Sequence, residues 1–333
     1  MPERIKDWGL APDLGQCRLC GSSAGQRYFW AEVYAGSGQA LRRCGYCAGV
    51  YLAPGFTDAG LTRFYQGPYR RLFPAEVPWR DKARFFAWRG DRDIARQRLG
   101  LIEPALAAGA RLFELGSGFG AFLGQAGRSR PDLALVASEP DSAHRGELLD
   151  GAPVRFVDNL PAVQPASVDA VVAFHVLEHL PDPLGFFQQA GEALREGGQL
   201  WVEVPDLMAA WNTRLFVHPA HLSYFCADAL RRLAEASGLQ VISCGQHPLA
   251  ALEGTLWLHA RRPERLAETP VRAAAQATVV AVDHWIERVG WGLRDRLKNF
   301  GKRRVLGLLG AGLVGELQRW RQYRARLRQE RTP

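Results

Sequence analysis

FELGSGFG, residues 113–120, follows a short apolar run and opens an amphipathic one. Its three glycines let the backbone turn sharply and approach a ligand, and the helix that follows presents free backbone N–H groups at its first turn. Dinucleotide-binding proteins use a similar turn with a different spacing, so the loop alone does not identify its ligand. It predicts a strand, a tight turn and a helix at a ligand-binding edge.

Short apolar runs alternate with amphipathic stretches around this loop. The apolar runs are residues 111–115, 133–138, 154–157, 168–174 and 199–204, and the helical patterns are residues 119–128, 142–149 and 184–195. This alternation predicts a parallel sheet with helices on both faces. A further helix is expected at 228–237. The strands expected at 240–244 and 255–260 have no long helix between them, which favours an antiparallel pair.

Polar residues follow two more of the predicted strands. Glu139 lies 19 residues beyond Gly120 at the end of the second strand, where a carboxylate can accept hydrogen bonds from both hydroxyls of a ribose. Asp158 and Asn159 follow the third strand, where they can contact an adenine edge. Because open parallel sheets bind ligands at the carboxyl ends of their strands, the pattern indicates a nucleoside ligand.

These motifs, in this order, resemble the class I methyltransferases that use S-adenosylmethionine. Besides the glycine loop they comprise SEPD (138–141), DNL (158–160), SVDAVVAFHVLEHL (167–180) and LREGGQLWVEVP (194–205). The resemblance covers about residues 110–261 and implies an α/β, Rossmann-like, seven-stranded sheet. It assigns the amino-acid end of S-adenosylmethionine to Glu114, Gly116, Ser117, Gly118 and Gly120, the ribose to Glu139, the adenine to Asp158 and Asn159, and a further cofactor contact to His175.

Histidines are the candidate bases for methyl transfer. Attack of an oxygen, nitrogen or carbon atom on a sulfonium methyl group depends chiefly on holding donor and acceptor in line, and a base helps when the acceptor is protonated. We favour His221 first and His179 second, with His218 as a further candidate. His218 and His221 stand in HPAHLSYF (218–225), which resembles the acceptor-side segment of many small-molecule methyltransferases. A structural hydrogen-bonding role is the alternative for each.

A metal site near the acceptor is a separate hypothesis. His175, Glu178 and His179 have the i, i+3, i+4 spacing that places side chains on one face of a helix. Imidazole and carboxylate groups in that arrangement can bind a divalent cation. The alternative is that these residues are only part of the signature of the fold.

Four cysteines near the start of the chain predict a structural zinc site. Cys17-x2-Cys20 and Cys44-x2-Cys47 are separated by 23 residues, and two such pairs can complete a closed tetrahedral site that leaves no catalytic position open. A zinc ribbon joined to this cofactor domain resembles the sugar C-methyltransferases that act on nucleotide-linked deoxy sugars. That group carries a large further C-terminal domain, whereas only residues 263–333 follow here.

The expected organisation has four parts. They are a zinc-ribbon module (1–58), a helical, aromatic linker (59–105), the methyltransferase domain (106–262) and a basic helical C-terminal region (263–333). Residues 284–333 hold 13 Lys and Arg against 4 Asp and Glu, a net charge of +9. The whole chain has a net charge of +8, so residues 1–283 together carry −1. No segment has the apolar length of a signal peptide or a membrane span, which predicts a cytoplasmic protein.

The basic tail has three interpretations. An apolar run at 305–315 lies between KRR (302–304) and the arginines of 319–328, a pattern that can lie on the inner face of an anionic membrane. The second interpretation, which we favour, is a helical hairpin that covers the catalytic domain or a dimer partner. Nucleic-acid binding ranks third, because the strong positive charge is far from the catalytic body.

The sequence therefore predicts methyl transfer to a small molecule, such as a nucleotide-linked or lipid-linked sugar or a natural-product intermediate. The rival functions are cofactor binding without catalysis and RNA methylation. An Asp/Asn-Pro-Pro-Tyr loop, typical of nucleobase amine methylation, does not follow the fourth strand, where FHVLEHL (174–180) stands instead. Nucleic acid is therefore a disfavoured partner.

Overall fold

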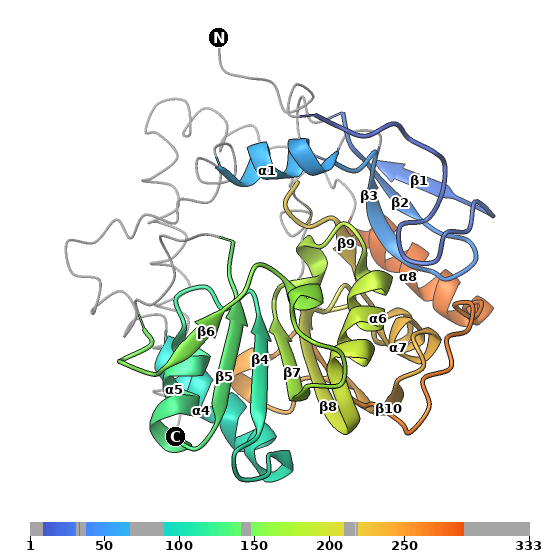
Figure 1. The fold of residues 1–333 in the computed structure, drawn as a ribbon. Helices are drawn as coiled ribbons and strands as arrows, with labels where there is room; N and C mark the ends of the chain where they lie inside the picture. Colours follow the sequence, from blue (N-terminus) through green and yellow to red (C-terminus); the bar gives the residue numbers. More distant parts are fainter. Residues whose placement is uncertain are drawn as a thin grey trace, which may run out of the picture.

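A computed structural model describes the protein over residues 9–30, 33, 38–66, 90–140, 148–209, 217 and 219–289. These residues form a seven-stranded sheet and a four-stranded sheet, which Figure 1 shows together with their helices. His218, most of the helix predicted at 142–149, the middle of the linker and the basic tail beyond residue 289 lie outside the described residues.

The large sheet has the strand order β10-β11-β8-β7-β4-β5-β6. Its strands are β4 (Arg111–Leu115), β5 (Ala134–Ser138), β6 (Val154–Phe156), β7 (Val168–Phe174), β8 (Leu194–Pro205), β10 (Gln240–Gln246) and β11 (Thr255–Arg261). The five strands from β6 to β8 pair in parallel, whereas β11 pairs antiparallel with both β8 and β10. The α/β, Rossmann-like, seven-stranded fold is therefore confirmed, as is the antiparallel pair at its end.

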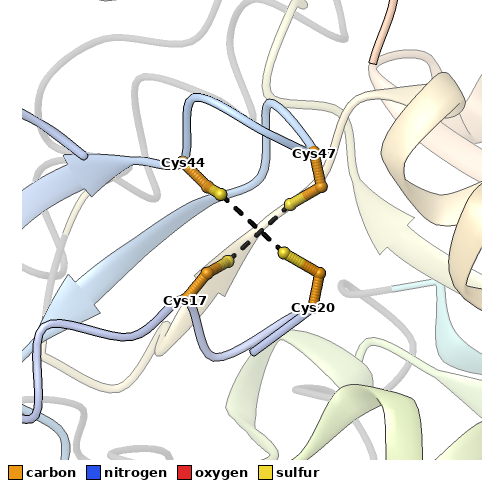
Figure 2. Close-up of side chains that lie close together, drawn as sticks. All are labelled: Cys17, Cys20, Cys44 and Cys47. Carbon is orange, nitrogen blue, oxygen red and sulfur yellow. Dashed lines mark hydrogen bonds between the residues drawn. The ribbon is translucent and has the colours of Figure 1, made fainter. Parts of the chain in front are cut away.

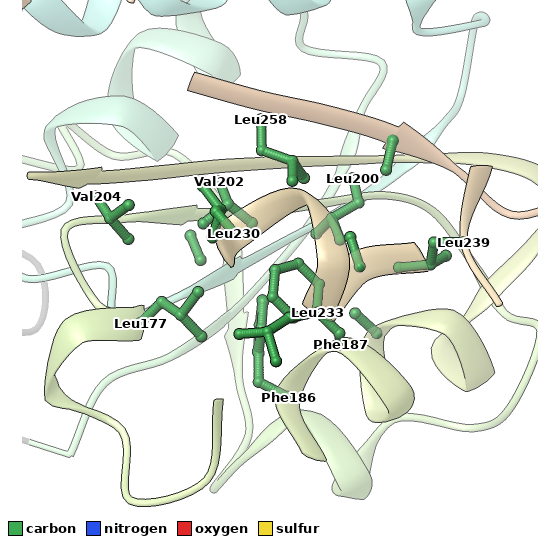
Figure 3. Close-up of a cluster of buried hydrophobic side chains, with 14 of the residues drawn as sticks. Leu177, Phe186, Phe187, Leu200, Val202, Val204, Leu230, Leu233, Leu239 and Leu258 are labelled. Atoms are coloured by element: carbon green, nitrogen blue, oxygen red, sulfur yellow. The ribbon is translucent and has the colours of Figure 1, made fainter. Parts of the chain in front are cut away.

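Alternate side chains of the central strands pack against two helical layers. The helices are α4 (Asp91–Ile102) and α5 (Ala121–Ser129) in one layer, and α6 (Pro183–Ala193) and α7 (Ala227–Ala236) in the other. Leu112 of β4 and Val172 of β7 pack with the first layer, and their neighbours Phe113 and Val171 pack with the second. Figure 3 shows this second layer, where Phe187 of α6 lies among leucines of β8 and α7. Burial on both faces explains why these strands are almost entirely apolar.

The strand β8 begins earlier than the sequence predicts, at Leu194 instead of Gln199. The five residues that the predicted run leaves out include two consecutive glycines, Gly197 and Gly198. Both still have backbone partners beyond the end of β11, because Gly197 donates to the Arg262 carbonyl at 3.0 Å and Arg262 donates to Gly198 at 2.9 Å. The segment is irregular within the strand, because Gly197 has a φ of 73° and the register of β8 against β7 shifts between Leu194 and Gln199.

The small sheet combines strands from the cysteine-containing region near the start of the chain with one strand from residues 223–224. Its order is β1 (Arg27–Trp30), β2 (Ala40–Arg43), β3 (Val50–Ala53) and β9 (Ser223–Tyr224), all paired antiparallel. β9 belongs to the HPAHLSYF segment, so a strand from the predicted methyltransferase domain completes the sheet of the cysteine-containing module. The predicted domain boundaries stay a prediction, and this sheet crosses them.

Two flanking helices and four short turns complete the described chain. They are α1 (Asp58–Gln66), α8 (Gln276–Val289), η2 (Glu103–Ala105), η3 (Leu160–Ala162), η4 (Leu177–His179) and η6 (Ala250–Leu252). α8 lies beside the small sheet in Figure 1 and buries Val282, Trp285 and Ile286 against it. Among the described helices, none is both long enough and apolar enough to cross a bilayer.

Candidate active site

The glycine loop between β4 and α5 has the backbone shape that its sequence predicts. Gly116, Gly118 and Gly120 have φ values of 68°, 51° and 83°, in the left-handed region. A Cβ at Gly116 would lie 2.5 Å from Val176, and one at Gly120 would lie 2.7 Å from Leu149. Glycine is therefore required by conformation and by space, whereas the Cβ direction of Gly118 is open.

Glu139 lies against this loop, as the motif order predicts. It directly follows β5 with only 7% of its surface exposed, and its Oε2 accepts a hydrogen bond from the Gly118 amide at 2.8 Å. The carboxylate therefore lies at the end of β5, next to the open space at Gly118. Its role as a ribose acceptor stays a prediction.

Two buried polar atoms in the glycine-loop region have no hydrogen-bond partner within the described residues: Glu114 Oε2 and Ser117 Oγ. Burial raises the pKa of Glu114 well above its ordinary value. Because buried polar atoms are almost always paired, an unpaired carboxylate oxygen and an unpaired hydroxyl indicate groups reserved for a ligand. The ammonium and carboxylate of the amino-acid end of S-adenosylmethionine fit these two residues.

Asp158 and Asn159 are exposed at the end of β6. The Asp158 carbonyl accepts from the Ser138 hydroxyl at 2.8 Å, which ties this turn to β5. Asn159 Oδ1 caps η3 by accepting from the Ala162 amide at 3.1 Å. The side-chain oxygen of Asn159 is therefore engaged locally, so its predicted contact with adenine would come from the amide nitrogen.

His179 and His221 come together at the carboxyl end of β7. Their ring centroids are 5.0 Å apart, and His179 Nδ1 lies 2.7 Å from the Ala220 carbonyl oxygen. Because a carbonyl can only accept, Nδ1 carries the proton, and in the neutral form of the ring Nε2 then has the free lone pair. The turn that holds His179 also packs on the glycine loop, through Val176 and Gly116.

Glu178 completes this cluster. The residue is 2% exposed, its Oε1 lies 3.9 Å from His179 Nε2, and its Oε2 has no partner within the described residues. One ligand atom from each of Glu178, His179 and His221 can be chosen so that all lie within 4.8 Å of one another. The sequence singled out all three residues and did not predict that they meet.

His175 is placed differently from the other histidines. It has φ 56° at the end of β7, its amide donates to the Glu203 carbonyl at 3.0 Å, and η4 begins only after it. The single helical face inferred for His175, Glu178 and His179 does not form, because only one short turn follows the strand. His175 Nδ1 still lies 3.6 Å from Glu178 Oε1, but the set of three ligand atoms within 4.8 Å of one another contains His221 and not His175. The cofactor contact assigned to His175 stays a prediction.

A buried ion pair lies beneath the site, and the sequence reasoning missed it. Glu203 of β8 is fully buried and accepts from Arg98 Nε and from His247 Nε2, both at 2.9 Å. Burial alone would raise the pKa of Glu203, but the hydrogen bond from His247 and the charge of Arg98 hold it below its ordinary value. The available signal was a glutamate inside the apolar run WVEVP, since a buried carboxylate requires partners.

The four predicted zinc ligands converge, as Figure 2 shows. Cys17 Sγ lies 3.7 Å from Cys47 Sγ, and Cys20 Sγ lies 3.8 Å from Cys44 Sγ. Tetrahedral zinc with Zn–S bonds of about 2.3 Å separates its sulfur ligands by about 3.8 Å. The described geometry fits a closed structural zinc site formed by these thiolates.

Comparisons with known proteins match the part of the chain that carries the glycine loop. Residues 86–244 match the family described as "Methyltransferase domain". The chain is 26% identical to a ubiquinone biosynthesis O-methyltransferase of Xanthomonas euvesicatoria pv. vesicatoria over 159 residues, covering 40% of this chain and 66% of that protein. It is 31% identical to the protein of the same name in Xanthomonas campestris pv. campestris strain B100 over 158 residues, covering 39% and 66%. The chain thus spans slightly less than two thirds of each relative.

Among solved structures, an S-adenosylmethionine-dependent methyltransferase from Mesorhizobium loti superposes with a TM-score of 0.43 and 14% identity. The superposition covers 51% of this chain and 100% of that one.

Proposed function

We propose that this protein, which contains a class I S-adenosylmethionine-dependent methyltransferase domain, transfers a methyl group to a hydroxyl oxygen of a small molecule. The main observation behind this proposal is the cluster of Glu178, His179 and His221, which lies beside the glycine loop at the carboxyl edge of the sheet. Imidazoles at this position suit an acceptor that must lose a proton. The curated relatives support oxygen as the acceptor atom, because their names describe O-methyltransferases.

The cofactor would be held by the residues of the glycine-loop region. S-adenosylmethionine supplies an electrophilic methyl group on a sulfonium sulfur. Glu114, Ser117 and the open backbone at Gly118 would bind its amino-acid end, and Glu139 its ribose, with Asp158, Asn159 and His175 around the rest. The unpaired polar atoms of Glu114 and Ser117 support this assignment.

His179 is our candidate base. Its Nδ1 proton is committed to the Ala220 carbonyl, so Nε2 can accept the hydroxyl proton as the oxygen gains the methyl group. Glu178 lies close enough to stabilise the imidazolium that results. The sequence ranked His221 above His179. We propose the reverse order, because the hydrogen bond at Nδ1 supports Nε2 of His179 as the acceptor of the proton, and we propose that His221 orients the acceptor.

The acceptor class includes intermediates of quinone synthesis and nucleotide-linked or lipid-linked sugars. The names of the relatives favour the first, and the cysteine module favours the second through its resemblance to sugar C-methyltransferases. The cytoplasm, with the basic tail at the inner membrane face, is the proposed location and suits a lipid-linked acceptor.

Transfer of a labelled methyl group tests this function. The purified protein would be incubated with methyl-labelled S-adenosylmethionine and a panel of phenols, nucleotide sugars and lipid-linked sugars. Label in a small-molecule methyl ether is expected, together with loss of transfer in a His179→Ala variant. Transfer only to RNA or to protein would overturn the proposal.

A second candidate function is metal-assisted transfer. Two imidazoles and a buried carboxylate are ligands that suit a divalent cation, and the Nδ1–H bond of His179 to a carbonyl orients its ring as in many metal-bound histidines. Calorimetric titration with Mg²⁺ or Mn²⁺ distinguishes the two functions. Binding that disappears in Glu178→Gln favours the metal, and no binding favours His179 as a base.

A further inference from the structure

We propose that the cysteine module positions the catalytic histidine pair, and that Arg18 and the pairing of β3 with β9 are the contacts through which it does so. The module is residues 17–53, from the first zinc ligand to the end of β3. The inference rests on the placement of His179 and His221 proposed above and does not depend on which acceptor is methylated.

The first contact is the strand pair. β3 begins three residues after Cys47, and its residues Val50 and Tyr51 pair with Tyr224 and Ser223 of β9. The Leu52 amide extends this ladder by donating to the Leu222 carbonyl at 3.0 Å. The residue next to His221 is therefore fixed to the strand that leaves the second cysteine pair.

The same segment then holds the turn that carries His179. The Leu222 amide donates to the Glu178 carbonyl at 2.7 Å, and the Ala220 carbonyl accepts from His179 Nδ1 at 2.7 Å. Leu222 thus uses its carbonyl toward the module and its amide toward η4. A continuous series of hydrogen bonds connects β3 to the histidine that we propose as the base.

Arg18 makes a second, direct connection. It stands between the zinc ligand Cys17 and Leu19, and its guanidinium donates to the Pro181 carbonyl at 3.2 Å and to the Leu52 carbonyl at 3.3 Å. Pro181 lies two residues beyond His179. A Cβ at Gly55 would lie 2.3 Å from Arg18 Nη2, so this glycine leaves the space that the guanidinium occupies. One side chain of the first cysteine pair thus joins β3 to the exit of η4.

The geometry predicts different effects on the two halves of the site. Metal at the four cysteines fixes the loop that carries Arg18 and the start of β3, and both then hold η4 and β9. The glycine loop and Glu139 are held by β4 and β5 instead. Replacing Arg18 should therefore loosen the orientation of the His179 ring and leave the affinity for S-adenosylmethionine unchanged. If Arg18 only stabilised the fold, its loss would not affect the two halves of the site differently.

The test is NMR of full-length protein labelled with ¹⁵N in its histidine rings, in wild type and in Arg18→Ala, Arg18→Lys and Arg27→Ala. Arg27 is the matched control, because it belongs to the same module but pairs with Asp283 and Glu287 of α8. In wild type His179 should show the fixed Nδ1–H tautomer. In Arg18→Ala its signals should move to a mixture of tautomers, with unchanged zinc content and with S-adenosylmethionine affinity within about twofold.

Arg18→Lys should lie between these states, because an ammonium can reach only one of the two carbonyls at a time. Arg27→Ala should match wild type. Wild-type His179 signals in Arg18→Ala would overturn the inference. Where an acceptor is known, kcat should fall about 10- to 100-fold in Arg18→Ala, as expected for a slightly misplaced catalytic group.

Metal release from wild type provides a second measurement in case Arg18→Ala does not fold. Stepwise removal of zinc with a thiol-reactive mercurial should abolish the fixed His179 tautomer in parallel with the metal, while S-adenosylmethionine still binds. Complete metal loss with unchanged His179 signals would contradict the proposal. Neither readout requires methyl transfer, so failure to find an acceptor would count against the proposed function alone.

Discussion

Glu139 is the residue whose predicted role is most directly testable, because its carboxylate lies against the glycine loop at the Gly118 amide. Glu139→Ala removes the proposed ribose acceptor. Charge-assisted hydrogen bonds contribute about 1.5–3 kcal/mol, so S-adenosylmethionine affinity should fall about 10- to 150-fold in calorimetric titration. Glu196→Ala, on an exposed part of β8, is the control. Unchanged affinity in Glu139→Ala would place the ribose elsewhere.

Replacing Glu114 should affect stability and cofactor binding in opposite directions. Burial raises its pKa above that of the unfolded chain. Above the unfolded pKa, folding must therefore either bury the charge or take up a proton, and this cost disappears as the pH falls below the unfolded pKa. Glu114→Gln should therefore raise the melting temperature of the cofactor-free protein at pH 7 by a few degrees and weaken cofactor binding. The gain over wild type should shrink toward pH 4 in calorimetry; a lower melting temperature at pH 7 would contradict this account.

Sequence reasoning at the residue scale predicted placement where neighbours follow predicted strands or stand in close pairs. Glu139 meets the glycine loop and the four cysteines converge, while the ligands of these residues stay predictions. Glu203 was missed because its partner Arg98 is 105 residues away, and no local pattern records such a pair. The meeting of Glu178 with His221 was missed for the same reason.

Helix α6 is the element that follows the histidine turn, and its first residues fix where that turn ends. Asp182 caps it by accepting from the Gly185 amide at 2.9 Å, with Pro183 at the first helical position. Asp182→Ala should cost about 1 kcal/mol of unfolding free energy in urea titration. Asp182→Asn should cost much less, because asparagine caps equally well. Equal losses in both variants would show that the carboxylate charge matters more than the cap.

At the scale of elements, the sequence prediction was accurate where local residues determine the element and inaccurate where contacts with distant residues determine it. β4 and β7 have the predicted limits because their apolar runs determine them. The helical face inferred for His175, Glu178 and His179 does not form because η4 has only three residues, although both histidines still approach Glu178, at 3.6 and 3.9 Å. β9 has two residues and exists only because β3 pairs with it; local sequence gives no signal for such a strand.

Across the whole molecule, the two sheets share their buried cores. Cys17, Leu19 and Tyr51 pack in the same apolar cluster as Phe113 and Val171 of the large sheet. α8 adds a second connection, since Asp283 pairs with Arg43 of β2 at 2.7 Å and Thr278 donates to Asp228 of α7, in a layer on the large sheet, at 3.0 Å. The sequence predicted the modules, but it could not predict their docking, because the contacts come from residues far apart in the chain.

Shared cores predict that the cysteine module and the large sheet unfold together. Cys44→Ser removes one of four thiolates and weakens a site whose metal contributes folding free energy. In calorimetry, zinc-loaded wild type should show one transition for the region that includes both sheets, and the variant should show one transition at a temperature several degrees lower. Cys244→Ser, outside the cluster, is the control for losing a thiol.

If Cys44→Ser instead showed one transition at the wild-type temperature and a second transition at a lower temperature, the cysteine module would unfold independently. The strand pair of β3 and β9 would then be too weak to hold His221 in place.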